Sequence, residues 1–309
     1  MRAHNETMRL AAIAGAAAAL LAPTALGAPL PGAPDCPVFP ASSVWNKPVH
    51  RLPVQKNSAT IVKAIGAKLD VHADFGSGLW DGGPIGIPIT VVGGSQTTSW
   101  VDFHYDEESD PGPYPIPPDV AIEGGPDADG DRHAVIVDRD SCTLYELFDL
   151  RPGWSAGSGA IWDLRSNLLR PRGWTSADAA GLPILPGLAR FHEVARGEID
   201  HALRFTVRRS RRAYVYPARH FASSSTDPRL PPMGLRLRLR ANFPVAGFPR
   251  QARIILRALK RYGMIVADNG SSWYISGAPD PRWSNDQLHT LHRVSGSDFR
   301  VVNTSKLRP

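Results

Sequence analysis

Side chains able to do acid–base chemistry gather between residues 102 and 149. In the strand predicted over residues 100–105, successive side chains alternate, so Asp102 and His104 lie on the same face. Glu123 ends another predicted strand, directly before two glycines. We therefore expect these side chains to face a groove formed by neighbouring strands of this region.

Glu146 and His133 extend this cluster. His133 opens an apolar strand, and Glu146 lies within another, where a carboxylate is costly to bury without a partner and burial raises its pKa. Glycoside hydrolysis uses a carboxylic acid of raised pKa together with an ionised carboxylate. We predict Glu146 as the proton donor and Glu123 or Asp102 as the second carboxylate. His104 and His133 would orient or polarise them.

Aromatic side chains near these carboxylates could stack on the apolar faces of sugar rings. Together with a histidine in a polar stretch, they form the predicted substrate-binding set of Trp100, Tyr105, Trp162 and His220. The combination predicts a glycan hydrolase that acts on a polysaccharide or cell-wall glycan. The alternative for each carboxylate is a solvated loop, and the alternative for each tryptophan is packing in the core.

An acidic turn suggests one cofactor, calcium. Asp127, Asp129 and Asp131 alternate as calcium ligands do in the first half of an acidic calcium-binding loop. The second half departs from that pattern, because Arg132 stands where such a loop requires glycine. A weak calcium site and a plain Asp/Gly turn both fit these residues, and no other cofactor is indicated.

Arginines are concentrated in two segments of the C-terminal half. Residues 235–240 alternate leucine with arginine as a strand does, and residues 207–215 are predicted to form a hairpin with a basic turn. The arginines concerned are Arg208, Arg209, Arg211, Arg212, Arg236, Arg238 and Arg240. A cationic sheet face favours a second hypothesis, a non-catalytic protein that binds cell-wall polymers or polysaccharides. The alternative is that these charges protect strand edges from aggregation. Nucleic-acid binding is not expected, because long basic runs with interleaved aromatic residues are missing.

The elements that must position these groups are mostly strands. The chain of 309 residues contains 28 glycines and 29 prolines, spread along its length as expected for short strands joined by tight turns. Residues 249–262 form the clearest amphipathic helix, with an apolar stripe and a glycine at its end. We predict a mainly β fold, a single β-sandwich or jelly-roll-like domain over residues 41–309 with a few peripheral helices and a helix-containing C-terminal part.

The N-terminus has the parts of an export signal. Arg2 and Arg9 precede a short apolar run over residues 10–21, and small residues follow at positions 25 and 27. We predict a signal peptide over residues 1–27, then an extended proline-rich segment over residues 28–40. The mature protein is expected to be secreted, extracellular or associated with the cell wall. No later stretch approaches 18 apolar residues, so integral membrane association is not expected.

Two cysteines, Cys36 and Cys142, are the only ones in the chain. In an oxidising compartment they are expected to form one disulfide. The bond would join the start of the mature chain to a strand about 106 residues away, and closing so long a loop stabilises a fold by about 4–5 kcal/mol in the chain-entropy account.

Three strings of the sequence carry a resemblance: Gly159–Asn167, Ser176–Gly187 and Ala218–Ser223. Together they resemble a group of uncharacterised secreted bacterial proteins, and the resemblance covers most of the mature chain. It implies export and a single domain. No activity is attached to the group, so no catalytic residue is carried over to this chain.

Overall fold

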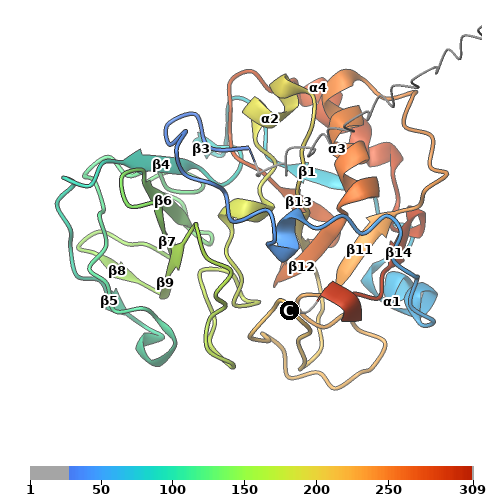
Figure 1. Ribbon diagram of the computed structural model, residues 1–309, viewed down its shortest axis with the longest axis horizontal. Helices are drawn as coiled ribbons and strands as arrows, with labels where there is room; N and C mark the ends of the chain where they lie inside the picture. Colours follow the sequence, from blue (N-terminus) through green and yellow to red (C-terminus); the bar gives the residue numbers. More distant parts are fainter. Residues whose placement is uncertain (1–27, 308–309) are drawn as a thin grey trace, which may run out of the picture.

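Strands form most of the regular structure in the computed structural model, which describes residues 28–307. The signal peptide predicted over residues 1–27 lies outside the described residues. Two larger sheets stand side by side, the four-stranded one drawn mainly in green and the six-stranded one in warmer colours (Figure 1). We call them the smaller and the larger sheet.

The larger sheet is mixed. Its strands, in spatial order, are β1 (His72–Asp74), β13 (Tyr274–Ser276), β10 (Leu203–Val207), β12 (Met264–Asn269), β11 (Arg236–Leu239) and β14 (Phe299–Val301). The pairs β1–β13 and β10–β12 are parallel, and the other pairs are antiparallel. A parallel pair needs a crossover connection, and the chain passes through β11 and the longest helix between β10 and β12.

The smaller sheet has the order β4 (Ile89–Val92), β6 (Ala134–Asp138), β7 (Thr143–Phe148) and β9 (Ser158–Asp163). Two short pairs accompany the sheets: β2 (Leu79–Trp80) with β3 (Gly83–Pro84), and β5 (Asp102–Phe103) with β8 (Ser155–Ala156). β6 is buried on both faces, as its unbroken apolar sequence predicts, because Val135 and Val137 belong to one core cluster and Ala134 and Ile136 to another.

Helices are few and short. The α-helices are α1 (Ser58–Ile65), α2 (Phe191–Arg196), α3 (Arg250–Arg261) and α4 (Asn285–His289). Single turns of 3₁₀-helix are η1 (Val44–Asn46), η2 (Asp106–Glu108), η3 (Leu185–Gly187), η4 (Thr290–Arg293), η5 (Gly296–Asp298) and η6 (Ser305–Leu307). The prediction of a mainly β, single-domain fold with few helices is confirmed. The jelly-roll arrangement is not confirmed, since the larger and the smaller sheet are both mixed and open.

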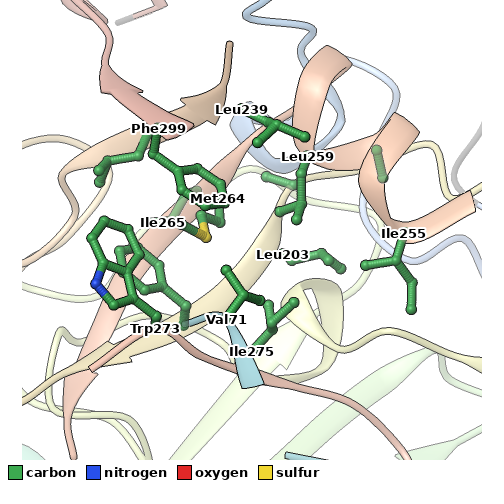
Figure 2. Close-up of a cluster of buried hydrophobic side chains, with 14 of the residues drawn as sticks. Val71, Leu203, Leu239, Ile255, Leu259, Met264, Ile265, Trp273, Ile275 and Phe299 are labelled. Carbon is green, nitrogen blue, oxygen red and sulfur yellow. The ribbon is translucent and has the colours of Figure 1, made fainter. Parts of the chain in front are cut away.

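α3 packs on the larger sheet and closes its core. Figure 2 shows Ile255 and Leu259 of the helix beside Leu203 and Met264 of the sheet. The chain turns from α3 into β12 at Gly263, whose φ is 72°. A side chain there would meet the Leu237 carbonyl oxygen at 2.1 Å, so only glycine allows this close approach.

Two predictions about the arginine-rich segments are wrong. Arg236 does not lie on an exposed face, because it is 1% exposed and its guanidinium donates to the carbonyl oxygens of Val44, Lys47 and Tyr262. The hairpin expected over residues 207–215 does not form. β10 ends at Val207, and Tyr214 pairs instead with Met233. The continuous cationic face proposed for these arginines is therefore interrupted.

The predicted disulfide is confirmed. Cys36 and Cys142 are bonded, with their Cα atoms 5.3 Å apart, and both belong to the core cluster of the smaller sheet. Residues 28–40 form successive turns, with a bridge between Leu30 and Ala33. Among residues 28–307, no helix has the length and apolarity needed to cross a membrane.

Candidate functional site: a pocket between the two sheets

Glu146 lies in the interior and not at a surface. Its side chain is fully buried, and its carboxylate accepts hydrogen bonds from the backbone N–H groups of Ile184 and Leu185, at 2.9 Å from Oε1 in both cases. Burial raises the pKa of Glu146 to about 7, against the opposing effect of these two bonds. The raised pKa that we predicted is present, but a group without exposed surface cannot reach a substrate. We therefore do not place Glu146 in the candidate site.

Glu123 and His133 are together, as predicted, but as an ion pair. His133 Nδ1 lies 2.5 Å from Glu123 Oε2, and its Nε2 lies 2.9 Å from the carbonyl oxygen of Ala177. The Glu123 carboxylate outweighs burial and raises the pKa of His133 to about 9, while the pKa of Glu123 is lowered by His133 despite burial. Both groups are thus charged at neutral pH. Because Ala177 lies in the chain between the sheets, the pair fixes the smaller sheet to that connection.

Asp102 and His104 lie elsewhere. Asp102 begins β5 and His104 directly follows it, and both line a shallow recess of about 390 Å³ together with Asp149 and Arg151. Both side chains are exposed. Neither shares this recess with Glu123 or Glu146, so the structure does not bring the five predicted catalytic residues into one site.

The four predicted substrate-binding residues separate into two groups. Tyr105 and His220 line one pocket. Trp162 is only 5% exposed and belongs to the core of the smaller sheet, with the Arg170 guanidinium 5.8 Å from its ring centre. Trp100 is 71% exposed and lies outside that pocket.

The acidic turn is held together by an arginine. Arg132 Nη1 donates to the carbonyl oxygens of Pro126 and Ala128, at 2.7 and 2.9 Å. Asp127 and Asp129 extend into solvent. Within residues 28–307, no group of three or more His, Cys, Asp or Glu side chains is arranged to hold a metal ion. The turn therefore has a structural explanation that does not involve calcium.

A pocket of about 350 Å³ lies between the two sheets. We call it the inter-sheet pocket. Its lining comes from β7, β9 and β12, from η2, and from the chain segments that pass between the sheets. The residues are Tyr105, Glu108, Asp131, Phe148, Ser158, Thr175, Ser176, Ala177, Ala179, His220, Ala222, Asp268 and Asn269. Here Asp268 of the larger sheet meets titratable groups from segments outside the strands, namely Glu108, Asp131 and His220.

Asp268 is the unusual acid of this pocket. It lies near the end of β12 with its side chain 18% exposed, its oxygens accept from the N–H groups of Ala179 and Asn269, and the fully buried Asp178 is a charged neighbour. Burial first, and then the neighbouring Asp178, raise the pKa of Asp268 to about 8. Two neighbouring carboxylates cannot both ionise cheaply, so Asp268 carries a proton at neutral pH.

An arginine holds the partner of this acid. Arg204 Nε and Nη2 donate to the two oxygens of Asp178, at 2.8 and 2.9 Å, in the bidentate geometry that favours a carboxylate. Arg204 also bonds Ser276 Oγ, and its Nη2 is 3.8 Å from Asp268 Oδ2. A register irregularity in β10, between Phe205 and Thr206, adjusts the alignment with β12 just beside these groups.

His220 and Glu108 also line the pocket. His220 Nδ1 lies 2.8 Å from the carbonyl oxygen of Ala179, which can only accept, so Nδ1 carries the ring proton. The other ring nitrogen, Nε2, lies 3.9 Å from Oε2 of Glu108. Glu108 is held by the Thr175 N–H at 2.8 Å and is 37% exposed. The pocket thus combines a proton donor with groups that can accept a proton.

Sequence reasoning missed Asp178, Arg204 and Asp268. Asp268 follows an apolar strand and precedes Asn269 and a glycine, a combination typical of a strand end, and that was the available signal. Arg204 and Asp178 carry no local signal, because their pairing joins positions 26 residues apart.

Comparisons with known proteins add no relative. No family model, no curated protein and no solved structure matches the chain. The functional argument therefore rests on the chemistry of the inter-sheet pocket.

Proposed function

We propose that the protein is a secreted glycan hydrolase whose acid–base site is the inter-sheet pocket. Asp268 protonates the leaving oxygen, and Glu108 is the ionised carboxylate that activates water or attacks the sugar. The Thr175 N–H holds Glu108 in place through a hydrogen bond of 2.8 Å to its Oε2. The observation that carries the proposal is the Asp178–Asp268 pair, which keeps a partly exposed acid protonated in a pocket that also contains a second carboxylate.

Two further observations support parts of the proposal. The disulfide between Cys36 and Cys142 is compatible with an oxidising, extracytoplasmic destination. Tyr105 and Phe148 supply aromatic surface to the same pocket, which suits the apolar faces of sugar rings. A polysaccharide is therefore the proposed substrate, in place of the basic-face ligand that the arginines suggested.

The decisive variant is Asp268→Asn, which retains the shape of the protonated acid and removes the proton that it donates. Reducing-end release from a panel of neutral, amino-sugar and acidic polysaccharides should fall by about 10²–10⁴-fold. Glu108→Gln should have a comparable effect. Glu107→Gln is the matched control, because Glu107 belongs to the same η2 turn but does not line the pocket. Asp268→Asn should melt close to wild type at pH 7, since the wild-type acid is already neutral there.

The pH profile gives a second readout. Activity requires protonated Asp268, so it is present below about pH 8 and falls as the pH rises through that value. The apparent pKa of this limb belongs to the Asp178–Asp268 pair as a unit. If wild type cleaves no glycan, or if Asp268→Asn is fully active, the hydrolase assignment is wrong. Binding without cleavage would favour the non-catalytic polysaccharide-binding hypothesis.

A further inference from the structure

A second and larger pocket, of about 510 Å³, lies at the β1 edge of the larger sheet. We call it the β1 pocket. It is formed by β1, β13, α4 and η4, with β2 at its rim. Its lining residues are His72, Ala73, Asp74, Phe75, Trp80, Ile85, Tyr274, Asn285, Leu288, His289 and His292. None of them belongs to the inter-sheet pocket.

Aromatic rings dominate the β1 pocket. Trp80 is 79% exposed, which leaves its ring face open. Register pairs His72 with Tyr274 across β1 and β13, and their rings stack with centres 4.2 Å apart. His292 completes this wall through a hydrogen bond of 2.9 Å between its Nε2 and His72 Nδ1. Open aromatic faces beside polar groups are the features by which proteins bind sugar rings.

A row of polar side chains crosses the larger sheet from one pocket to the other. Asp74 of the β1 pocket lies opposite Ser276 on the neighbouring strand. Ser276 bonds Arg204 on the next strand, and Arg204 reaches Asp268 in the inter-sheet pocket. Ser276 and Arg204 are buried, so the row shows how far apart the two pockets lie and does not itself contact a ligand. Neighbouring strands are about 4.8 Å apart, so the three steps from β1 to β12 span roughly 14 Å. This is longer than one sugar ring and matches a chain of several.

Carboxylates line both pockets. Asp74 lines the β1 pocket, Asp131 and Glu108 line the inter-sheet pocket, and Asp74 interacts electrostatically with Asp131. Arg204 contributes no free positive charge, because Asp178 neutralises it. The imidazoles of the β1 pocket do not compensate either, since burial and their mutual repulsion lower the pKa of His72 and His292. Polyanions are therefore disfavoured along this face.

We propose that the β1 pocket is a second saccharide-binding subsite, which holds a neutral or amino-sugar chain that extends from the inter-sheet pocket. The direction of the sugar chain rests on the proposed function, and the inference adds the class of substrate that the enzyme would take. Trp80 and the His72–Tyr274 stack bind sugar rings by their faces, and Asp74 binds hydroxyl or ammonium groups. Acidic polysaccharides are excluded by the carboxylates that line the two pockets.

Binding is measured by calorimetry with the Asp268→Asn variant, so that no ligand is cleaved. The probes are hexamers of β-1,4-linked glucose, of β-1,4-linked glucosamine and of α-1,4-linked galacturonate, and the dimer of whichever hexamer binds. The second change is Trp80→Ala, and the control is Leu168→Ala, because Leu168 is an equally exposed apolar side chain, 81% accessible, outside both pockets. We expect Trp80→Ala to weaken hexamer binding by about tenfold and dimer binding hardly at all. Leu168→Ala should change neither.

Failure of this inference can be distinguished from failure of the proposed function. If wild type cleaves nothing but Trp80→Ala weakens hexamer binding, the subsite stands and the hydrolase assignment fails. If wild type cleaves a glycan and Trp80→Ala matches Leu168→Ala in both binding and kcat/KM on polymer, the subsite is wrong. Galacturonate bound more tightly than glucose and glucosamine, or no hexamer bound at all, would also overturn it.

Discussion

Glu146 shows how one buried carboxylate can have a raised pKa for a reason unrelated to catalysis. β7 places it in the interior, where it accepts hydrogen bonds from the first residues of the turn that contains η3. Such turns leave backbone N–H groups without partners, and a carboxylate that accepts two of them joins the turn to the sheet. The carboxylate thus connects the smaller sheet to the chain that leads toward Asp178 and Arg204.

Glu146→Gln should therefore lower stability and leave the chemistry intact. Gln keeps one accepting oxygen but introduces buried N–H donors without partners, which costs about 1–3 kcal/mol. Because folding raises the pKa of Glu146 to about 7, its own contribution is fully present below about pH 4.5 and is lost as the pH rises through 7. The stability difference between wild type and the variant should therefore be largest at acidic pH.

Urea denaturation at pH 5 and pH 8 measures this difference. The activity of the folded fraction should equal that of wild type, in contrast to Asp268→Asn, which should lose activity but retain its melting temperature at pH 7. A Glu146→Gln protein that keeps full stability and loses turnover would return Glu146 to the catalytic role predicted from the sequence.

The sequence could indicate which residues are chemically unusual, but not what they contact. The apolar neighbours of Glu146 predict burial and a raised pKa, and both are present. Its partners, Ile184 and Leu185, lie 38 and 39 residues away and carry no side-chain signal for the bond. Arg236 is a similar case, since the alternation that predicts its strand does not reveal the backbone carbonyl oxygens around it.

At the scale of elements, the periodicity of apolar residues is enough to predict the helices and strands whose burial is regular. The predicted helix over residues 249–262 matches α3, because its apolar stripe packs on the larger sheet. α1 is tied to the same sheet, because the hydroxyl of Ser58, its first residue, accepts a hydrogen bond from the Val301 N–H of β14. The hairpin over residues 207–215 fails because Ser210 bonds Asn269 and Tyr214 pairs with Met233.

Shortening a buried side chain of α3 should destabilise the larger sheet. Leu256 is fully buried in its core, so Leu256→Ala should cost about 2–5 kcal/mol in free energy of unfolding. Arg257 is the next residue and is exposed, and Arg257→Ala should stay within about 0.5 kcal/mol of wild type. Chemical denaturation followed by circular dichroism measures both variants. Equal losses in the two would contradict the packing of α3 described here.

For the whole molecule, the order of strands decides what the sequence can reveal. Both sheets place strands side by side that are distant in the chain, as in β1–β13–β10–β12. The inter-sheet pocket joins η2, the chain around Ala177 and the end of β12, so Glu108, His220 and Asp268 meet only after both sheets have formed. Local periodicity contains no information about that pairing. This explains why the predicted carboxylates lie in separate places and do not form one site.

The disulfide acts at this same scale. Cys36 lies in the N-terminal segment, and Cys142 lies in the turn between β6 and β7. Leu30, Val38 and Phe39 of that segment pack into the core of the smaller sheet, so the disulfide keeps the N-terminal segment packed against this sheet. The larger sheet has its own core cluster, which contains neither cysteine.

Replacing both cysteines by serine should therefore destabilise the protein, and the smaller sheet most directly. Opening a loop with a sequence separation of 106 removes about 4–5 kcal/mol in the chain-entropy account, and 2–5 kcal/mol is the usual range for a native bond. Hydrogen exchange should show the earliest loss of protection in residues 28–40, β6 and β7, while β12 remains protected. Because the inter-sheet pocket takes Phe148 and Ser158 from the smaller sheet, the activity proposed for the pocket should decline at a lower temperature than in wild type. A variant with unchanged stability, or one that first loses protection in β12, would contradict this account.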